Sequence, residues 1–364
     1  MVHIPGNLGK EPLPLPASNL KYSEKKKNII GIAGTAKNTG KTTTLNCLLK
    51  EAAQRNLLVA VTGIGFDGEE LDNVTLLPKP RVIVYRNSIV TTSEHCLDIS
   101  TATVEILHRT GIYTSLGEVL IMRVLIAGLI VIAGPSKKKE LQIVIETMVQ
   151  YNVDCIFVDG SLNRISPMSV VQSIIFSTGA SRTTDIAVLS SEMYALEYLL
   201  QLPITPLDYI PNSDTIEVPL LLEVGDVEDL KVKYLRGNKT LFISKLISTI
   251  ALERLTTHCL NSSIQIQNLI FSDPFALLIN ENIVQTYKNI SELIKSNITV
   301  TYSSAPKLAC ITANPFFPQF IGNKYFSQSI DKEELVNKLQ LVCSTPIFNT
   351  QETDSSIIFD TCIN

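Results

Sequence analysis

Several features that would point to particular classes of protein are missing from the sequence. It has no tryptophan and only 4 histidines in 364 residues, and its 7 cysteines form neither a C-x-x-C pair nor the spacing of a zinc site. Basic residues are not in excess: 31 Lys and Arg stand against 35 Asp and Glu, for a net charge of −4 and a pI near 5.7. Proteins that bind nucleic acid through its phosphates are usually basic. We therefore expect no nucleic-acid partner and no cysteine-based metal site.

Long apolar segments are missing as well. The longest apolar stretch, residues 119–135, is interrupted by Arg123, and its uninterrupted part is shorter than the roughly 18–20 residues of a membrane-spanning helix. Residues 1–16 lack the charged head and apolar centre of a signal peptide. Apolar residues still make up 45% of the chain, which suffices for a buried core. The sequence thus predicts a cytoplasmic protein without a membrane partner.

The order of apolar runs, turns and helical patterns predicts an α/β protein of two domains. Residues 1–27 are expected to form a flexible N-terminal arm. Residues 28–205 alternate short apolar runs with helical patterns, as in a doubly wound, mostly parallel sheet. Residues 206–364 are less regular and predict a second, smaller α/β domain that binds a partner or a substrate.

The expected elements can be given by their ranges. In the first domain, strands are expected over 28–34, 57–62, 82–85, 119–125, 129–133, 154–158 and 185–189. Helices are expected there after Gly40, after Ser136, after Ser166 and near 192–200. In the second domain the clearest elements are helices over 241–255 and 331–341 and strands near 298–302 and 308–312.

The strongest chemical signal is the loop that joins the first expected strand to the first expected helix. Its sequence is GTAKNTGKTT, and all of its residues are candidate phosphate contacts: Gly34, Thr35, Ala36, Lys37, Asn38, Thr39, Gly40, Lys41, Thr42 and Thr43. Small residues allow successive backbone N–H groups to point into one concavity at the N-terminus of a helix, where an anion is stabilised. Lys41 is expected to contact the β- and γ-phosphates, and Thr42 to bind Mg²⁺ through its hydroxyl. The sequence therefore predicts a P-loop that binds ATP and Mg²⁺.

Two details of the sequence bear on this prediction. The usual spacing G-x-x-x-x-G-K-[ST] would place glycine at position 35, whereas this chain has Thr35 there and Gly34 one residue earlier, so the loop is one residue longer. The chain also lacks an Asn-Lys-x-Asp sequence, which favours ATP over GTP. The alternative is an ordinary turn between a strand and a helix, with Lys41 exposed to solvent.

A carboxylate at the end of a buried strand is the second signal. Asp159 ends the apolar part of the run CIFVDG, where an acidic residue beside a P-loop strand binds Mg²⁺ through water. The alternative for Asp159 is a routine Asp-Gly turn. The run Lys137-Lys138-Lys139 follows another strand end, and either an anionic ligand, an acidic partner or a solvated helix start would explain it.

The lengthened loop resembles that of dethiobiotin synthetases and cobyric-acid-type synthetases, which belong to the SIMIBI class of P-loop NTPases together with the MinD-like ATPases. The resemblance implies roles for two further residues. Lys37 lies one position out of register from the signature lysine of the MinD-like group, and the alternative is a solvated lysine. Asp67, in the run GFDGEE, matches an acid that binds Mg²⁺ or orients the attacking water, and the alternative is a solvated loop. The resemblance thus implies Lys41, Asp67 and Asp159 as catalytic residues, with Thr42, Asp67 and Asp159 at the metal.

Three segments together resemble the smaller subunit of the lysine 5,6-aminomutase reactivases: the loop GTAKNTGKTTTLN, residues 61–81 and residues 157–169. The resemblance extends over most of residues 28–210. It implies an ATP-driven factor that restores an inactivated adenosylcobalamin enzyme by cofactor exchange, acting with a larger MutS-like subunit and with the aminomutase itself. In such a factor the first domain is the ATP-dependent switch and the second domain contacts the partner.

Two other functions stay open at the level of the sequence. One is an ATP-dependent ligase or kinase of the dethiobiotin-synthetase type, in which the second domain closes over a small metabolite. The other is a nucleotide-binding module with little hydrolysis, so the sequence predicts an ATPase but leaves turnover open. A homo-oligomer is also compatible with the sequence.

Overall fold

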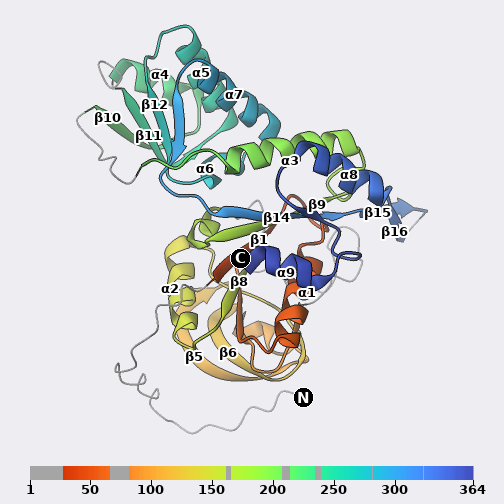
Figure 1. The fold of residues 1–364 in the computed structure, drawn as a ribbon. Helices are drawn as coiled ribbons and strands as arrows, with labels where there is room; N and C mark the ends of the chain where they lie inside the picture. The colour runs from red at the N-terminus through yellow and green to blue at the C-terminus, as the bar shows by residue number, and fades with distance from the viewer. Residues whose placement is uncertain are drawn as a thin grey trace.

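The computed structural model contains two mainly parallel β-sheets with helices packed against them (Figure 1). It describes residues 28–65, 82–160, 165–206, 214–233, 239–280, 282–322 and 324–363. Within these residues the larger sheet has nine strands in the order β17-β14-β9-β1-β8-β2-β4-β6-β5, and the smaller sheet has four in the order β10-β11-β12-β13. The chain is therefore an α/β protein, as its sequence predicts.

The strands of the larger sheet come from both ends of the chain: β1 (Asn28–Gly34), β2 (Val59–Gly63), β4 (Ile89–Ser93), β5 (Thr103–Thr114), β6 (Gly117–Ile126), β8 (Cys155–Asp159), β9 (Ser173–Gly179), β14 (Lys307–Asn314) and β17 (Ile347–Phe348). Neighbours from β17 to β4 pair in parallel, whereas β6 pairs antiparallel with both β4 and β5. The expected parallel sheet thus carries an antiparallel extension at one edge.

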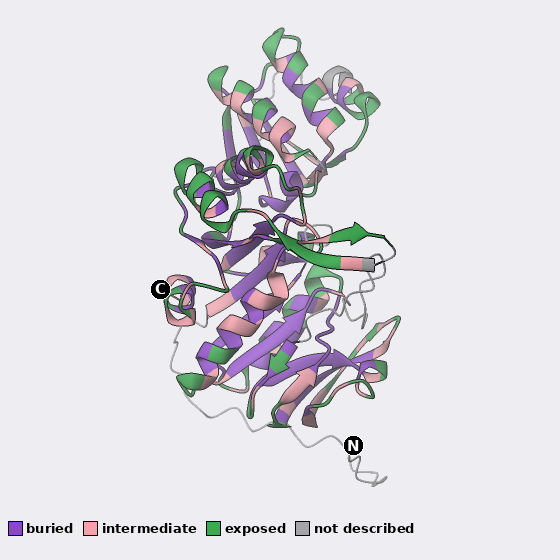
Figure 2. Cartoon of the chain, turned by 90° about the vertical axis from the view of Figure 1, so that its right-hand side faces the viewer, coloured by how far each residue is buried: buried purple, intermediate pink, exposed green. Residues whose placement is uncertain are grey.

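Helices cover both faces of the larger sheet, which is why its central strands are apolar throughout (Figure 2). Side chains of α1 and α9 share a core with Ile30 and Ile32 of β1, and those of α2 and α3 share a core with Ala33 on the opposite face. The helices in contact with this sheet are α1 (Lys41–Gln54), α2 (Lys138–Val149), α3 (Ile186–Leu200), α8 (Lys332–Val342) and α9 (Ser355–Ile363).

The smaller sheet is formed by residues between α3 and β14. Its strands, all paired in parallel, are β10 (Thr215–Leu221), β11 (Thr240–Ile247), β12 (Asn268–Phe271) and β13 (Thr299–Tyr302). Its helices are α4 (Val224–Lys233), α5 (Thr249–Leu260), α6 (Phe275–Leu278) and α7 (Ile283–Lys295). The hydroxyl of Tyr302, fully buried, donates to the carbonyl of Leu199 at 2.7 Å and so joins this unit to α3.

The expected division of the chain at residue 205 is therefore wrong in one respect. Residues 206–364 were expected to form one C-terminal domain, but β14 pairs in parallel with β9 and β17 pairs with β14, so the chain returns to the larger sheet. The smaller sheet is an insertion between two parts of the larger unit. An apolar strand such as residues 308–312 can join either sheet, and only the long-range pairing decides which.

Most expected elements are found within a few residues, and three local differences have clear causes. Residues 185–189, expected as a strand, form the start of α3, because the Asp185 carboxylate caps the helix by accepting from the N–H groups of Ala187 and Val188. Residues 241–255, expected as one helix, divide into β11 and α5 at the capping residue Ser248. Residues 166–170, expected as the start of a helix, form a 3-10 helix, η3 (Ser166–Val170). Several strands were not expected at all, among them β4, β5, β9, β10 and β12.

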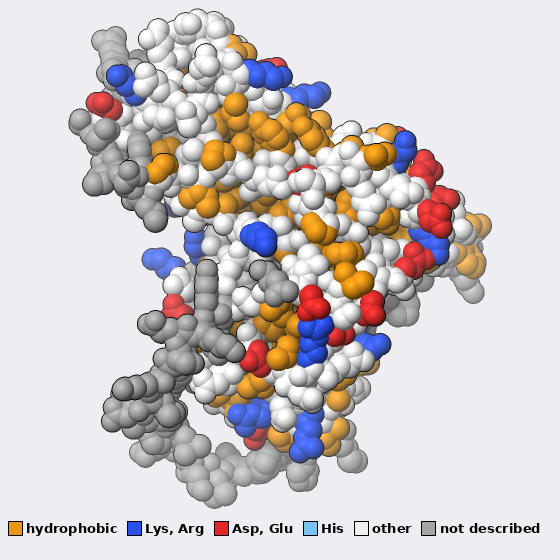
Figure 3. All heavy atoms as spheres, viewed as in Figure 1, with side chains coloured by type: hydrophobic (Ala, Val, Ile, Leu, Met, Phe, Trp, Pro, Cys, Tyr) orange, Lys and Arg blue, Asp and Glu red, His pale blue; other side chains and the backbone are white. Residues whose placement is uncertain are grey.

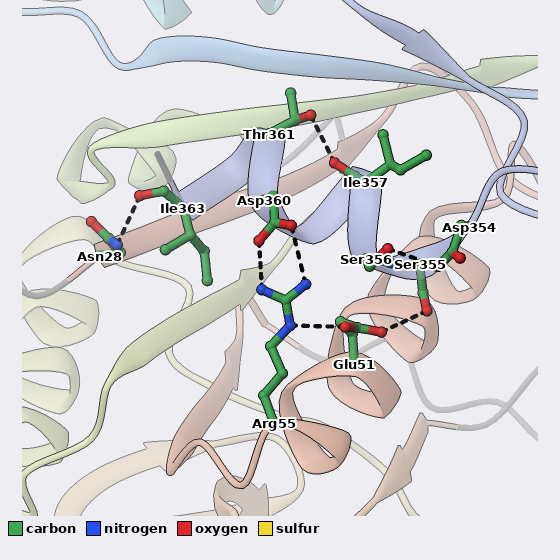
Figure 4. A network of polar contacts seen from close by, with 10 residues as sticks. All are labelled: Asn28, Glu51, Arg55, Asp354, Ser355, Ser356, Ile357, Asp360, Thr361 and Ile363. Carbon is green, nitrogen blue, oxygen red and sulfur yellow. Dashed lines mark hydrogen bonds and ion pairs between the residues drawn. The ribbon is translucent and has the colours of Figure 1, made fainter.

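The C-terminal helix α9 is fastened to α1 by a polar network (Figure 4). The guanidinium of Arg55 donates to both carboxylate oxygens of Asp360, at 2.5 and 3.2 Å, and to Glu51 at 2.8 Å. Glu51 in turn accepts from the hydroxyl of Ser355 at 2.8 Å, and the guanidinium lies 4.8 Å from the ring centre of Phe359. The end of the chain thus supports the helix that follows the glycine loop.

Two short antiparallel pairs complete the fold. They are β3 (Val82–Val84) with β7 (Gly128–Ile130), and β15 (Phe316–Ile321) with β16 (Lys324–Ser329). The second pair is a hairpin that extends beyond α8 (Figure 1). In the part of the chain that the structure describes, no helix is long and apolar enough to cross a bilayer.

Glu197 of α3 holds the segment that leads into β17. Its carboxylate accepts four hydrogen bonds from the N–H and hydroxyl groups of Ser344 and Thr345, at 2.6–3.0 Å, and a fifth from the side-chain amide of Gln201 at 3.3 Å. Burial raises the pKa of this carboxyl, but the hydrogen bonds outweigh burial and hold the pKa below its ordinary value of 4.5. The ionised form is therefore the one that stabilises the fold.

Replacing Glu197→Gln is expected to lower the free energy of unfolding by about 1–3 kcal/mol, since an amide accepts these donors less strongly and brings donors of its own. Because the pKa is lower in the folded state, the stabilisation by Glu197 is complete above pH 4.5 and is lost as the pH falls below it. Urea unfolding of both proteins between pH 3.5 and 7.5 measures this, with the exposed Glu253→Gln as control. A constant difference across that range would contradict the assignment.

Candidate functional site

The loop between β1 and α1 is compact, and two of its residues have backbone angles that favour glycine or asparagine. Gly40 has a φ of 94° and Asn38 a φ of 61°. The hydroxyl of Thr39 donates to the carbonyl of Ala36 at 3.0 Å and closes the loop upon itself. A Cβ at Gly34 would lie 2.8 Å from this hydroxyl, so the longer loop requires glycine at position 34 rather than 35.

The ends of two neighbouring strands hold the loop from one side. The carbonyl of Asn38 accepts from the side-chain amide of Asn314, the last residue of β14, at 2.9 Å and from the hydroxyl of Ser181, after β9, at 3.1 Å. Thr35 donates its backbone N–H to the carbonyl of Ser177 at 2.9 Å. The loop is therefore positioned by β9 and by β14, the strand with which the chain returns to the larger sheet.

A buried hydroxyl cluster lies beneath the loop, between α1 and the sheet. Thr44 of α1 and Ser177 of β9 both contact the hydroxyl of Thr312 in β14, at 2.9 and 2.8 Å. Each of the three side chains is shielded from solvent, so each hydroxyl depends on the others for its hydrogen bonds. The cluster fixes the first turn of α1 relative to β9 and β14.

Lys41 and Asp159 meet at the carboxyl edge of the sheet. Strand β8 pairs directly with β1, so Asp159 at its end stands opposite Ile32 near the start of the loop. The ammonium of Lys41 donates to the Oδ1 atom of Asp159 at 2.6 Å, and their side chains are 15% and 13% exposed. Among the described residues these two side chains form polar contacts only with each other, and both are partly exposed, so Lys41 can exchange the carboxylate for another anion.

The N-terminus of α1 points into the same place. Among the described residues, no side chain caps this helix at Gly40 and no acidic residue lies in its first turn. The partial positive charge of the helix end and the ammonium of Lys41 therefore act together. Thr42 and Thr43 follow in the first turn, half-buried.

The structure brings together most, not all, of the residues proposed from the sequence. Residues 34–43 form one continuous loop and helix start, with Asp159 in contact with Lys41. Lys37 is exposed, which agrees with a solvated lysine as well as with a contact to a ligand or partner. Asp67 lies outside the described residues.

The inserted unit reaches the edge of the loop. Leu278, at the end of α6, and Asn280 line a small cavity of about 30 Å³ with Thr35. The same cavity is bordered by Arg182, whose guanidinium forms an ion pair with Glu192 at 2.8 Å. The smaller sheet is thus close enough to the loop for a ligand there to influence its position.

The lysine run at the start of α2 is engaged in ion pairs. Lys137 contacts Glu140 at 2.9 Å, and the ammonium of Lys138 lies 4.0 Å from the carboxylate of Asp273, after β12. Burial raises the pKa of the Asp273 carboxyl, and the nearby Lys138 opposes that effect. The run therefore links the two units, which the sequence did not suggest.

Within the described ranges, no group of three or more His, Cys, Asp or Glu side chains is placed to hold a metal ion. Comparisons of the chain with protein-family models, with curated proteins and with solved structures give no match.

Sequence reasoning missed the residues that support the loop from the side, namely Ser177, Ser181, Thr312 and Asn314. A polar residue directly after an expected strand, as Asn314 is, carries a weak signal for a position at a sheet edge. This signal could not be used, because nothing in the sequence indicates that residues 307–314 pair with β9.

Gly40→Ala is expected to destabilise the protein by about 1–2 kcal/mol, because alanine is strained at a φ of 94° and its Cβ would lie 3.2 Å from the Cβ of Asn314. Gly225→Ala in α4 is the matched control, since nothing lies within 4 Å of its added Cβ. That control is expected to gain up to about 1 kcal/mol from helix propensity. Thermal unfolding of both variants checks the prediction, and equal effects would contradict it.

Proposed function

We propose that the loop of residues 34–43 binds the phosphates of ATP with Mg²⁺ and that the chain is a P-loop ATPase. The observation that carries the proposal is the contact of Lys41 with Asp159 at 2.6 Å, at the N-terminus of an uncapped helix and at the end of adjacent parallel strands. This edge of an open α/β sheet is where ligands usually bind. Phosphate oxygens suit both the helix end and the lysine.

Each residue has a specific role in this proposal. Lys41 exchanges its partner Asp159 for phosphate oxygens, which leaves the carboxylate available to hold a water on Mg²⁺. Thr42 offers its hydroxyl to the same ion, and the glycine at position 40 keeps the backbone accessible to the phosphates. Bound Mg²⁺ neutralises charge that develops on the phosphates during hydrolysis.

Lys41→Ala is expected to weaken ATP binding about 10–100-fold, which corresponds to the loss of one charge-assisted hydrogen bond. Asp159→Asn is expected to reduce the rate of ATP hydrolysis. This variant should keep most of the affinity for ATP that is measured in the absence of Mg²⁺. Isothermal titration calorimetry with ATP, with and without Mg²⁺, measures the affinities, and the rate of phosphate release measures turnover. Lys50→Ala is the control, because this lysine is exposed on the same helix. Unchanged affinity in the Lys41 variant would contradict the proposal.

We further propose that the ATPase serves as the smaller subunit of a factor that reactivates lysine 5,6-aminomutase. The support is the resemblance of three segments of the sequence, including the glycine loop. A switch is also supported by the cavity beside Thr35, which Leu278 and Asn280 of the inserted unit line. Loss of the γ-phosphate at the loop would change the surroundings of these two residues. A partner protein with equal affinity for the states before and after loss of the γ-phosphate could not be bound and released in turn by hydrolysis.

The same arrangement is compatible with the ligase or kinase of the dethiobiotin-synthetase type, in which the inserted unit would cover a small substrate. These two functions differ in what stimulates turnover. ATP hydrolysis is therefore measured with the chain alone, with inactivated lysine 5,6-aminomutase and a MutS-like large subunit, and with small carboxylates and amines.

The reactivase proposal predicts turnover that rises at least about tenfold only with the two proteins and recovery of aminomutase activity, both lost in Lys41→Ala. Stimulation by a small carboxylate or amine alone would replace it with the ligase. ATP binding without turnover under any of these conditions would leave only a nucleotide-binding module. Absence of ATP binding would contradict the P-loop itself.

A further inference from the structure

The hairpin of β15 and β16 is exposed on both of its faces. Side chains alternate between the faces of a strand, and Phe316 and Phe320 point to one face while Ile321 and, from β16, Phe326 point to the other. Their exposed fractions are 37%, 59%, 49% and 48%. Figure 2 shows the hairpin as a largely exposed ribbon, and in Figure 3 apolar atoms occupy the same end of the molecule. A two-stranded ribbon that packs on nothing is at most marginally stable in water.

Hydrogen bonds fix the base of the hairpin. The N–H of Ile330 donates to the carbonyl of Pro315 at 3.0 Å, and the carbonyl of Phe316 accepts from Ser181 at 3.2 Å. Only two residues separate β16 from α8, and the second of them, Asp331, caps that helix through the N–H of Glu334 at 2.8 Å. The part of the chain that the structure describes leaves both apolar faces accessible, so each of them is available to a partner.

A groove of matching character lies on the other side of α8. It has a volume of about 1090 Å³ and runs between α3, α7 and α8. Its apolar lining includes Tyr194, Leu341 and Val342, which are 40%, 78% and 37% exposed, and the ring of Tyr287 packs edge-on against Tyr194 at 5.4 Å. This volume exceeds that of most metabolite pockets, so a polypeptide segment fits it better than a small molecule.

We propose that the groove receives the β15–β16 hairpin of a second copy of this chain, in a two-fold symmetric dimer. One chain carries both complementary surfaces, and an exchange related by a two-fold axis buries both at once and closes the assembly. The 6 residues of each hairpin strand and the 13 that line the groove amount to 25 residues per copy. A standard stable interface uses about 20–30 residues on each side.

The charges of the chain permit this association. The hairpin sequence, residues 316–329, contains no acidic residue, while Asp185 and Glu334 border the groove beside a single Lys338. The net charge of −4 is small for 364 residues, so two copies repel one another weakly. The proposal is independent of the proposed function, since it involves neither the glycine loop nor a nucleotide.

Sedimentation velocity of the full chain between 1 and 100 μM, without nucleotide or other proteins, tests the dimer. The wild-type protein is expected to be dimeric. Phe320→Asp in the hairpin and Leu341→Asp in the groove each raise the dissociation constant at least about tenfold, because each puts a charge into the apolar contact. Ile250→Asp on α5 is the control, since Ile250 is 62% exposed and lies outside both surfaces. Melting curves identify a variant that has unfolded, and Phe326→Ser then replaces the hairpin variant.

A mixture of the two variants tests the exchange itself. A mixed dimer keeps one intact contact, the hairpin of the Leu341→Asp copy in the groove of the Phe320→Asp copy, so the mixture should associate where neither variant does alone. A photo-cross-linking residue at position 320 should attach to α3 or α8 of another chain. A wild-type monomer at 100 μM, no association of the mixture, or cross-links within one chain would each overturn the proposal.

Discussion

Parallel pairing of β1 between β8 and β9 is the constraint on which the rest of the structure depends. It brings the start of the glycine loop and the end of β8 to one edge of the sheet, so that Lys41 and Asp159 meet. It also places the end of β9 against the loop, where Ser181 holds the carbonyl of Asn38. Because parallel strands run in the same direction, all of their carboxyl ends contribute to the same site.

The return of the chain to this sheet explains how its two units are connected. Strand β14 extends the sheet beyond β9, and Asn314 at its end completes the support of the loop. The inserted unit is joined to α3 through Tyr302 and reaches Thr35 through the segment after α6. The loop, the insertion and the base of the outer hairpin thus lie close to one another, around Thr35 and Ser181.

Much of the larger sheet could be predicted because its signals are local. The run NIIGIAG, the glycine loop and the helix after it follow one another without interruption, and Asp159 stands at the end of a short apolar run. The expected strand at 185–189 failed because an apolar run after a capping aspartate can be either a strand or a helix. Strand β9 was overlooked because its sequence, SIIFSTG, directly follows a short 3-10 helix instead of a turn with glycine or proline.

The sequence by itself determined the class of the fold, the position of the loop and the identity of the lysine and carboxylate that face each other. Backbone preference, periodicity and residue type act over a few residues, so these features could be identified locally, although the contact between the lysine and the carboxylate also needs the pairing of β1 with β8. Only the tertiary structure decided that residues 307–314 belong beside β9, that Asn314 and Ser181 support the loop, and that the hairpin remains uncovered. These features depend on pairings between segments more than 100 residues apart. The sequence of an apolar strand does not indicate which strand it will pair with.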